Sequence, residues 1–144
     1  MGRMIEYVAV HPDEPVARNG AIKIYGPDGF EGMRKAGRLA AEVLDALVPH
    51  LVHGVTTEEL DTLVREHKLR GGGIPATLNY RGYTHSCCIS INHVVCHGIP
   101  GPRQLKSGDI VNIDVTVIVD GCMEIPAACF WSATCRSRRA GWLM

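Results

Sequence analysis

Apolar residues in the first half of the chain recur at the spacing of a helix. Between Pro27 and Pro49 they repeat every three or four positions, at Met33, Ala36, Leu39, Ala40, Val43, Leu44 and Leu47. This period places one apolar stripe along the side of an amphipathic helix. We predict that the helix begins near Pro27, a residue favoured in the first turn, and ends before Pro49, which cannot continue it.

A second helix is predicted from Thr56 to about Lys68. Thr56 and Glu59 have the spacing of a capping box, in which each side chain pairs with the backbone amide of the other residue. The apolar residues that follow share one face: Leu60, Leu63 and Val64. Three glycines at 71–73 lack the Lys-Ser/Thr pair of a phosphate-binding loop, so we interpret them as a chain reversal.

The second half of the chain alternates apolar and polar residues, which is the period of strands. Valine and isoleucine occupy one face of the segment 112–119, and polar side chains occupy the other, at Asn112, Asp114 and Thr116. Ser86–Asn92 and Val94–Cys96 are predicted as two further strands, and Asp120-Gly121 is a strong hairpin signal. Helices followed by hairpin-linked strands predict an α+β fold, with an antiparallel sheet and helices on one face.

Composition narrows the class of protein. The 144 residues suit a single domain, 46% of them are hydrophobic and the formal net charge is zero, so nothing favours nucleic acid as a partner. Residues 1–24, interpreted as an extended arm, contain no run long enough for a signal peptide or a membrane span, and we expect a cytoplasmic protein. The six cysteines are then expected to be thiols, and none of them forms a CxxC pair.

Asp114 is the first candidate for chemistry, because an ionised carboxylate on a half-buried strand needs a partner. That partner is a cation, a set of hydrogen-bond donors or a bound metal. His97 follows the apolar run Val94–Cys96 and precedes Gly98, so we expect it to be delivered to the same region. Considered alone, each residue has a plainer interpretation: Asp114 capped by backbone donors, and His97 satisfied within its loop.

Several ordered motifs between residues 22 and 121 resemble the bacterial type of methionine aminopeptidase. They read MRKAGR from Met33, GVTTEELD from Gly54, NYRGY from Asn79, CISIN from Cys88, VVCHGIP from Val94 and GDIVNIDVT from Gly108. Such a set is far more specific than one short motif. The resemblance implies a pita-bread fold, in which two pseudo-symmetric α+β halves enclose two divalent ions, with residues 25–121 as the N-terminal half.

The resemblance also implies roles for single residues. Asp114 corresponds to a metal-ligating carboxylate, and His97 to a catalytic histidine that contacts the substrate. Tyr80, Tyr83 and Cys88 correspond to the pocket for the methionine side chain. These residue types suit the chemistry, since carboxylates bind divalent ions that make a hydroxide from water, and sulfur with aromatic rings suits a thioether.

The function that the resemblance implies is removal of the initiator methionine from nascent proteins by a dinuclear metal hydrolase. Its cofactors would be two divalent ions drawn from Co, Mn, Fe, Zn or Ni. Its partners would be the N-terminus of a nascent polypeptide and, as a candidate, the ribosome; neither nucleic acid nor a membrane is expected. Two alternatives stay open: a non-catalytic peptide-binding half-domain, and a proline-specific peptidase of the same fold, which the Asn79-Tyr80 and Cys88 motifs disfavour.

The resemblance breaks after Gly121. The family continues with His-Gly-Asp, whose Asp is a second metal ligand, whereas this chain continues Cys122-Met123-Glu124-Ile125 and has Ile125 at the Asp position. Read from the third base of the cysteine codon, this segment encodes Tyr or His, then Gly, then Asn or Asp. We therefore expect residues 122–144 to be an out-of-frame tail without a helix or strand period, and the chain as written to be inactive or nearly so.

Overall fold

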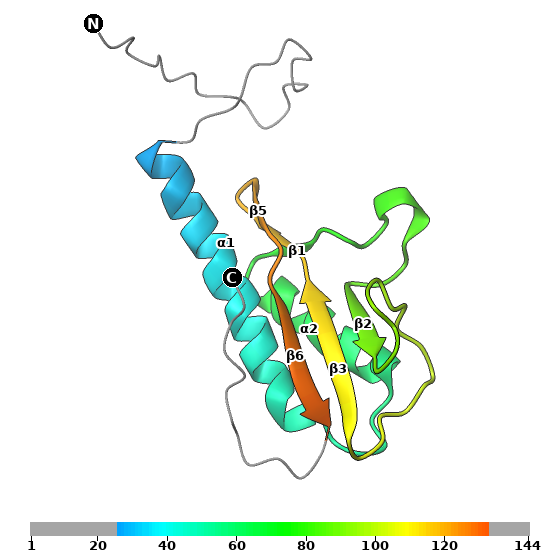
Figure 1. The fold of residues 1–144 in the computed structure, drawn as a ribbon. Coiled ribbons are helices and arrows are strands. Elements are labelled where there is room, and N and C mark those ends of the chain that lie inside the picture. The colour runs from blue at the N-terminus through cyan, green and yellow to red at the C-terminus, as the bar shows by residue number, and fades with distance from the viewer. Residues whose placement is uncertain (1–25, 133–144) are drawn as a thin grey trace, which may run out of the picture.

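A computed structural model describes residues 26–132 of the chain. The helical elements are α1 (Pro27–Leu47), η1 (Val48–His50), α2 (Thr57–Arg70) and η2 (Tyr80–Gly82). The strands are β1 (Ile74–Pro75), β2 (Cys87–Ile91), β3 (Asp109–Val115), β4 (Val117–Val119), β5 (Cys122–Glu124) and β6 (Ala127–Ser132). The two α-helices, α1 and α2, therefore precede all of the strands along the chain (Figure 1).

Both predicted helices are confirmed, together with their end signals. Pro27 opens α1, and Pro49 lies in the short 3-10 turn that follows it. At the start of α2 the Thr56 hydroxyl accepts a hydrogen bond from the Glu59 amide at 3.2 Å. The Glu59 carboxylate in turn accepts one from the Thr56 amide at 2.7 Å, which completes the capping box.

The strands form two three-stranded antiparallel sheets, in the orders β1-β4-β5 and β2-β3-β6. The Asp120-Gly121 turn closes a hairpin in which Val119 pairs with Cys122. Both turn residues have positive φ, 48° and 79°, as a tight two-residue hairpin requires. The same register continues past a break at Thr116 into the β3-β6 pair, so one long bent hairpin joins the two sheets.

The core lies between the helices and one face of the sheets. On β3 the side chains of Val111, Ile113 and Val115 are fully buried against apolar residues of α1 and α2. Figure 1 shows β2, β3 and β6 in front and α2 behind them. The polar residues Asn112 and Asp114 alternate onto the opposite face, which confirms the predicted α+β arrangement with helices on one face. No helix within residues 26–132 is both long enough and apolar enough to cross a membrane.

The prediction of a strand at Val94–Cys96 is wrong. The chain turns immediately after β2, where the Val94 amide donates to the Ile91 carbonyl at 3.2 Å. Val95 is 90% exposed, so the apolar run does not enter the core. A run of three apolar residues carries too little information to separate a strand from a turn, and here the local hydrogen bond decides for the turn.

The expectation that residues from 122 onward follow no strand period is wrong for residues 122–132. These residues form β5 and β6, and β6 pairs with β3 over its whole length. Ala128 and Phe130 pack against the core while Cys129 and Trp131 face outward, which is the alternation of a half-buried strand. Residues 133–144 and the proposed arm at 1–24 lie outside the described residues.

Candidate active site

Asp114 and Cys88 are direct cross-strand neighbours on the outer face of the β2-β3-β6 sheet. The Oδ1 atom of Asp114 is buried and has no hydrogen-bond partner among residues 26–132. Burial raises the pKa of Asp114 above its usual range, and the charges of His97 and Lys68 oppose this shift. The side chain thus combines a desolvated carboxylate oxygen with two basic residues nearby, His97 and Lys68.

The unpaired Oδ1 of Asp114 suits a divalent ion as one of its ligands. A buried carboxylate oxygen without a donor is costly, and a metal ligand bond removes that cost. Asp114 therefore fits one ligand position. Within residues 26–132, however, no group of three or more His, Cys, Asp or Glu side chains is close enough to hold a metal ion. This part of the chain offers a single carboxylate rather than a complete site.

Ile125 occupies the place where a second carboxylate would stand. The register on either side pairs Val117 with Glu124 and Asp114 with Ala127, so Ile125 lies opposite Thr116 and diagonal to Asp114. Its side chain is 59% exposed and offers no donor atom to a cation. Position 125 therefore supplies no ligand atom beside Asp114.

The loop that carries His97 is held against the edge of β2. The Ile89 amide donates to the Gly98 carbonyl at 2.8 Å, and the Gly98 amide donates to the Ser90 hydroxyl at 3.1 Å. A Cβ atom at Gly98 would overlap the Ile89 carbonyl, so this close approach requires glycine. His97 itself has a φ of 54°, is exposed, and lies close enough to Asp114 to influence its charge.

Tyr83 joins this cluster and Tyr80 does not. The Tyr83 hydroxyl donates to the Cys87 carbonyl at 2.8 Å and lies beside the Cys88 thiol. Burial raises the pKa of both Tyr83 and Cys88. Tyr80 is 61% exposed, and its ring contacts the guanidinium of Arg81 at 5.3 Å. Four of the five predicted site residues are therefore gathered, and Tyr80 points to solvent instead.

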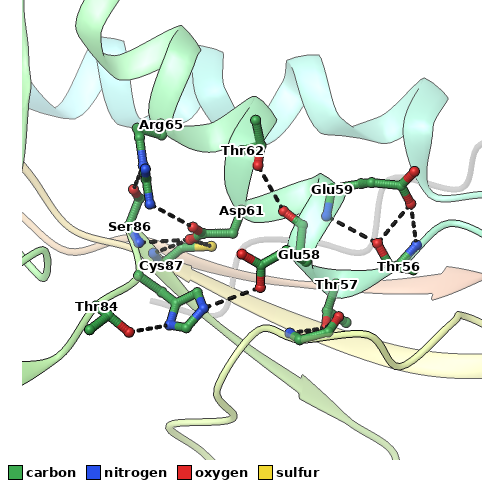
Figure 2. Close-up of polar contacts among 12 residues, drawn as sticks. Thr56, Thr57, Glu58, Glu59, Asp61, Thr62, Arg65, Thr84, Ser86 and Cys87 are labelled. Carbon is green, nitrogen blue, oxygen red and sulfur yellow. Dashed lines mark hydrogen bonds and ion pairs between the residues drawn. The ribbon is translucent and has the colours of Figure 1, made fainter.

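A buried polar network that the sequence pattern did not predict lies under this cluster. Asp61 on α2 is 1% exposed and accepts hydrogen bonds from the Ser86 amide at 2.7 Å and the Cys87 amide at 2.9 Å. The Cys87 thiol also donates to it at 3.3 Å, and Arg65 forms an ion pair with it at 3.6 Å (Figure 2). Asp61 thereby fixes the backbone at the start of β2, next to Cys88.

Lys68 is the second member of the network and is fully buried. Its Nζ donates to the Ser86 carbonyl at 2.5 Å and to the Thr116 carbonyl at 3.0 Å. Burial lowers the pKa of Lys68 to about 8, and the neighbouring Cys87 and Asp61 oppose this shift. One signal could have found the network: Asp61, Val64 and Lys68 have the i, i+3, i+7 spacing of one helix face, so both charges lie on a buried stripe.

Because of Lys68, the free energy of unfolding should change with pH in the alkaline range. Its pKa is about 8 in the folded protein against an ordinary value of 10.5, so from pH 8 upward the unfolded chain binds more protons and stability rises. Burial raises the pKa of Cys87, so above about pH 9 the unfolded chain loses a proton that the folded protein keeps, and stability falls. We expect the free energy of unfolding in urea to rise from pH 8 to 9 and then decline. A Lys68→Met variant should lose the rise and keep the decline; a monotonic fall in the wild type would contradict this.

Comparisons with known proteins show the family of this chain. Residues 31–132 match the model of metallopeptidase family M24. The chain is 55% identical over 100 residues to the methionine aminopeptidase of Rickettsia prowazekii, covering 69% of this chain and 39% of that protein. It is 54% identical over 103 residues to the methionine aminopeptidase of Escherichia coli K12, covering 70% of this chain and 39% of that protein. The crystal structure of the R. prowazekii protein is similar with a TM-score of 0.77 at 49% identity, covering 78% of this chain and 46% of that one.

The chain spans about two fifths of the length of the curated relatives it matches. Its likeness to solved methionine aminopeptidases confirms the expected α+β half of a pita-bread fold. Since the family match extends over well more than half of the chain, the protein belongs to metallopeptidase family M24.

Proposed function

We propose that this chain carries one half of a methionine aminopeptidase site, which removes the initiator methionine from nascent polypeptides. The observation that carries the proposal is the buried, unpaired Oδ1 of Asp114, flanked by Cys88 across the strand and by His97 on the adjoining loop. The relatives that share this segment are named methionine aminopeptidases. The substrate would be the N-terminus of a nascent chain, with the ribosome as a candidate partner.

Each residue has a role in this proposal. Asp114 would be one ligand of a pair of divalent ions, drawn from Co, Mn, Fe, Zn or Ni, which supply Lewis acidity and an activated water when bound. His97, exposed beside Asp114, would contact the substrate and orient its carbonyl. Cys88 and Tyr83 would line the pocket for the methionine side chain, because sulfur and aromatic groups suit a thioether. Tyr80 could join them only after a movement from its solvent-exposed position.

A second candidate function is binding of Met-initiated peptides without hydrolysis. One observation favours it: Ile125 stands diagonal to Asp114 where a second carboxylate would complete a shared site. Hydrolysis by two ions needs ligands that hold both of them, and one carboxylate does not. We therefore propose that the chain as written has little or no turnover, although its family is enzymatic.

The proposal is tested by restoring the second carboxylate. The full chain should not hydrolyse a Met-Ala-Ser peptide measurably in Mn²⁺ or Co²⁺. Ile125→Asp should bind Mn²⁺ at least about tenfold more tightly, because two carboxylates on one sheet face share the ion. Ile110→Asp is the matched control, since Ile110 is also an exposed apolar residue of this sheet but lies four positions from Asp114 along β3. Robust turnover by the wild type, or equal affinity in both variants, would contradict the proposal.

The origin of Ile125 is a separate proposal about the coding DNA. We propose that the frame changes after Gly121, because the shifted codons for Cys122, Met123, Glu124 and Ile125 permit the family's His-Gly-Asp. Independent sequencing of this region tests the proposal, and shifted codons that do not encode His-Gly-Asp would reject it.

A further inference from the structure

β6 forms one edge of the β2-β3-β6 sheet (Figure 1). It pairs with β3 on one side, and no strand in the described part of the chain pairs with its other side. The Val115 amide donates to the Pro126 carbonyl at 3.0 Å, which makes these two residues a hydrogen-bonded pair of the antiparallel ladder. Because such pairs alternate with non-hydrogen-bonded pairs, Ala127, Cys129 and Trp131 direct their backbone amides and carbonyls away from β3. The free edge therefore offers a row of donors and acceptors to another strand.

The side chains along this edge are apolar and exposed. Ala127, Cys129 and Trp131 all lie on the outer face of the sheet. The Trp131 side chain is 68% exposed and lies opposite Ile110 of β3, which is 50% exposed. The segment 125–132 contains no charged residue. Natural sheets commonly protect a free edge with lysine, proline or an inward-pointing charge, and β6 itself contains none of these, so its edge is suited to pairing with another chain.

We infer that β6 pairs antiparallel with β6 of a second copy of this chain, about a two-fold axis at Cys129. Free-edge groups must oppose free-edge groups in such a pair, so Cys129 lies opposite Cys129, and Trp131 lies opposite Ala127 at both ends. This register is self-complementary, because a large side chain meets a small one twice. Any other two-fold register engages fewer of the free-edge groups. The absence of charge in segment 125–132 also removes like-charge repulsion between two identical strands.

The pairing would extend the outer face that carries the candidate site. Cys88, Asp114 and Ala127 occupy one row across β2, β3 and β6. Neighbouring strands are about 4.8 Å apart, so Trp131 of the second copy would occupy the next position in this row. The indole would then border the candidate site on the side of β6. The pairing itself does not depend on the function proposed above.

The register is tested through the Cys129 thiol, which is exposed. Opposed residues of a hydrogen-bonded pair have Cα atoms about 5.5 Å apart, a separation that a disulfide spans. Copper phenanthroline with oxygen removes two electrons and two protons from the opposed thiols and should join two full chains through Cys129. Cys129→Ser should abolish this covalent dimer, whereas Cys96→Ser, which removes another exposed thiol, should retain it. A covalent dimer that persists in Cys129→Ser overturns the inference.

The strength of the pairing is measured by sedimentation equilibrium of the full chain with a reductant present. Cys129→Pro removes the central donor of the free edge and leaves the hydrogen bonds to β3 intact. The dimer loses two hydrogen bonds, so its Kd should rise at least about tenfold. Trp131→Lys places a charge on the same edge and should weaken the dimer as well. Met123→Lys is the matched control, because Met123 is an exposed apolar residue of β5 in the other sheet, and it should leave the Kd unchanged.

Thermal melting confirms that each variant is folded, and if Cys129→Pro does not fold, the increase in Kd is required of Trp131→Lys. A wild type that stays monomeric at its highest soluble concentration overturns the inference. Equal weakening by Met123→Lys and Trp131→Lys does so too. Hydrogen exchange at the Cys129 and Trp131 amides should become slower as the protein concentration rises. Protection that does not depend on concentration would show that the edge is covered within a single chain, by residues 133–144, and would also overturn the inference.

Discussion

Replacing Asp61 by alanine should destabilise the protein by about 3–5 kcal/mol, the range found when one partner of a buried charged network is removed. The substitution leaves the amides of Ser86 and Cys87 without their acceptor in a site closed to water. It also leaves the buried ammonium of Lys68 with one fewer opposing charge. Urea unfolding at pH 7 measures the loss.

Two further variants of α2 serve as references for the loss of unfolding free energy in Asp61→Ala. Glu66→Gln changes an exposed carboxylate of α2 and should alter the unfolding free energy by less than about 0.5 kcal/mol. Asp61→Asn retains one acceptor oxygen and should fall between the wild type and Asp61→Ala. A loss of less than about 1 kcal/mol in Asp61→Ala would show that water replaces the carboxylate, and that the network does not hold α2 to β2.

Replacing Gly98 by alanine should displace the loop that carries His97 and cost about 1–3 kcal/mol, as for other overpacked sites. The added methyl group would overlap the Ile89 carbonyl, which belongs to the backbone and cannot rotate away. The loop must therefore retreat from β2 and lose the hydrogen bond from the Ile89 amide to the Gly98 carbonyl. Because His97 is the preceding residue, it should move away from Asp114.

The displacement is measured by hydrogen exchange at the Ile89 amide, which should become faster, together with the loss of stability in urea. Gly101→Ala is the matched control, because a methyl group there meets no atom within 4 Å and should leave both measurements close to the wild type. Unchanged exchange at Ile89 in Gly98→Ala would show that the loop tolerates the methyl group. The close approach of Gly98 to the Ile89 carbonyl would then not be what positions His97.

Asp61→Ala and Gly98→Ala affect opposite sides of the Asp114 carboxylate. Asp61 and Lys68 hold the backbone below the outer face of the sheet, through contacts at Ser86, Cys87 and Thr116. Gly98 lets the His97 loop approach that face from the side. A substitution that removes either set of contacts should alter the surroundings of Asp114 and leave its side chain unchanged. We therefore expect the site to be sensitive to residues that do not themselves contact the Asp114 carboxylate.

The sequence by itself determined the elements whose signals are local. The three-to-four spacing of apolar residues predicted α1, and the Thr56 capping box predicted the start of α2. Alternation around Asp114 predicted one strand, which the structure divides at Thr116 into β3 and β4, and Asp120-Gly121 predicted the hairpin turn between β4 and β5. These signals succeed because periodicity and turn chemistry act between residues a few positions apart. Motif resemblance also anticipated the family and its half of the pita-bread fold.

Only the tertiary structure decided how the site is supported. Lys68 meets partners 18 and 48 positions away, and Asp61 meets partners 25 and 26 positions away. Read locally, charged residues on a helix are assigned to solvent, because burying a charge is costly unless distant groups pair with it. Whether those partners arrive depends on how the helices pack against the sheets. The same dependence on distant partners placed residues 127–132 in a strand beside β3.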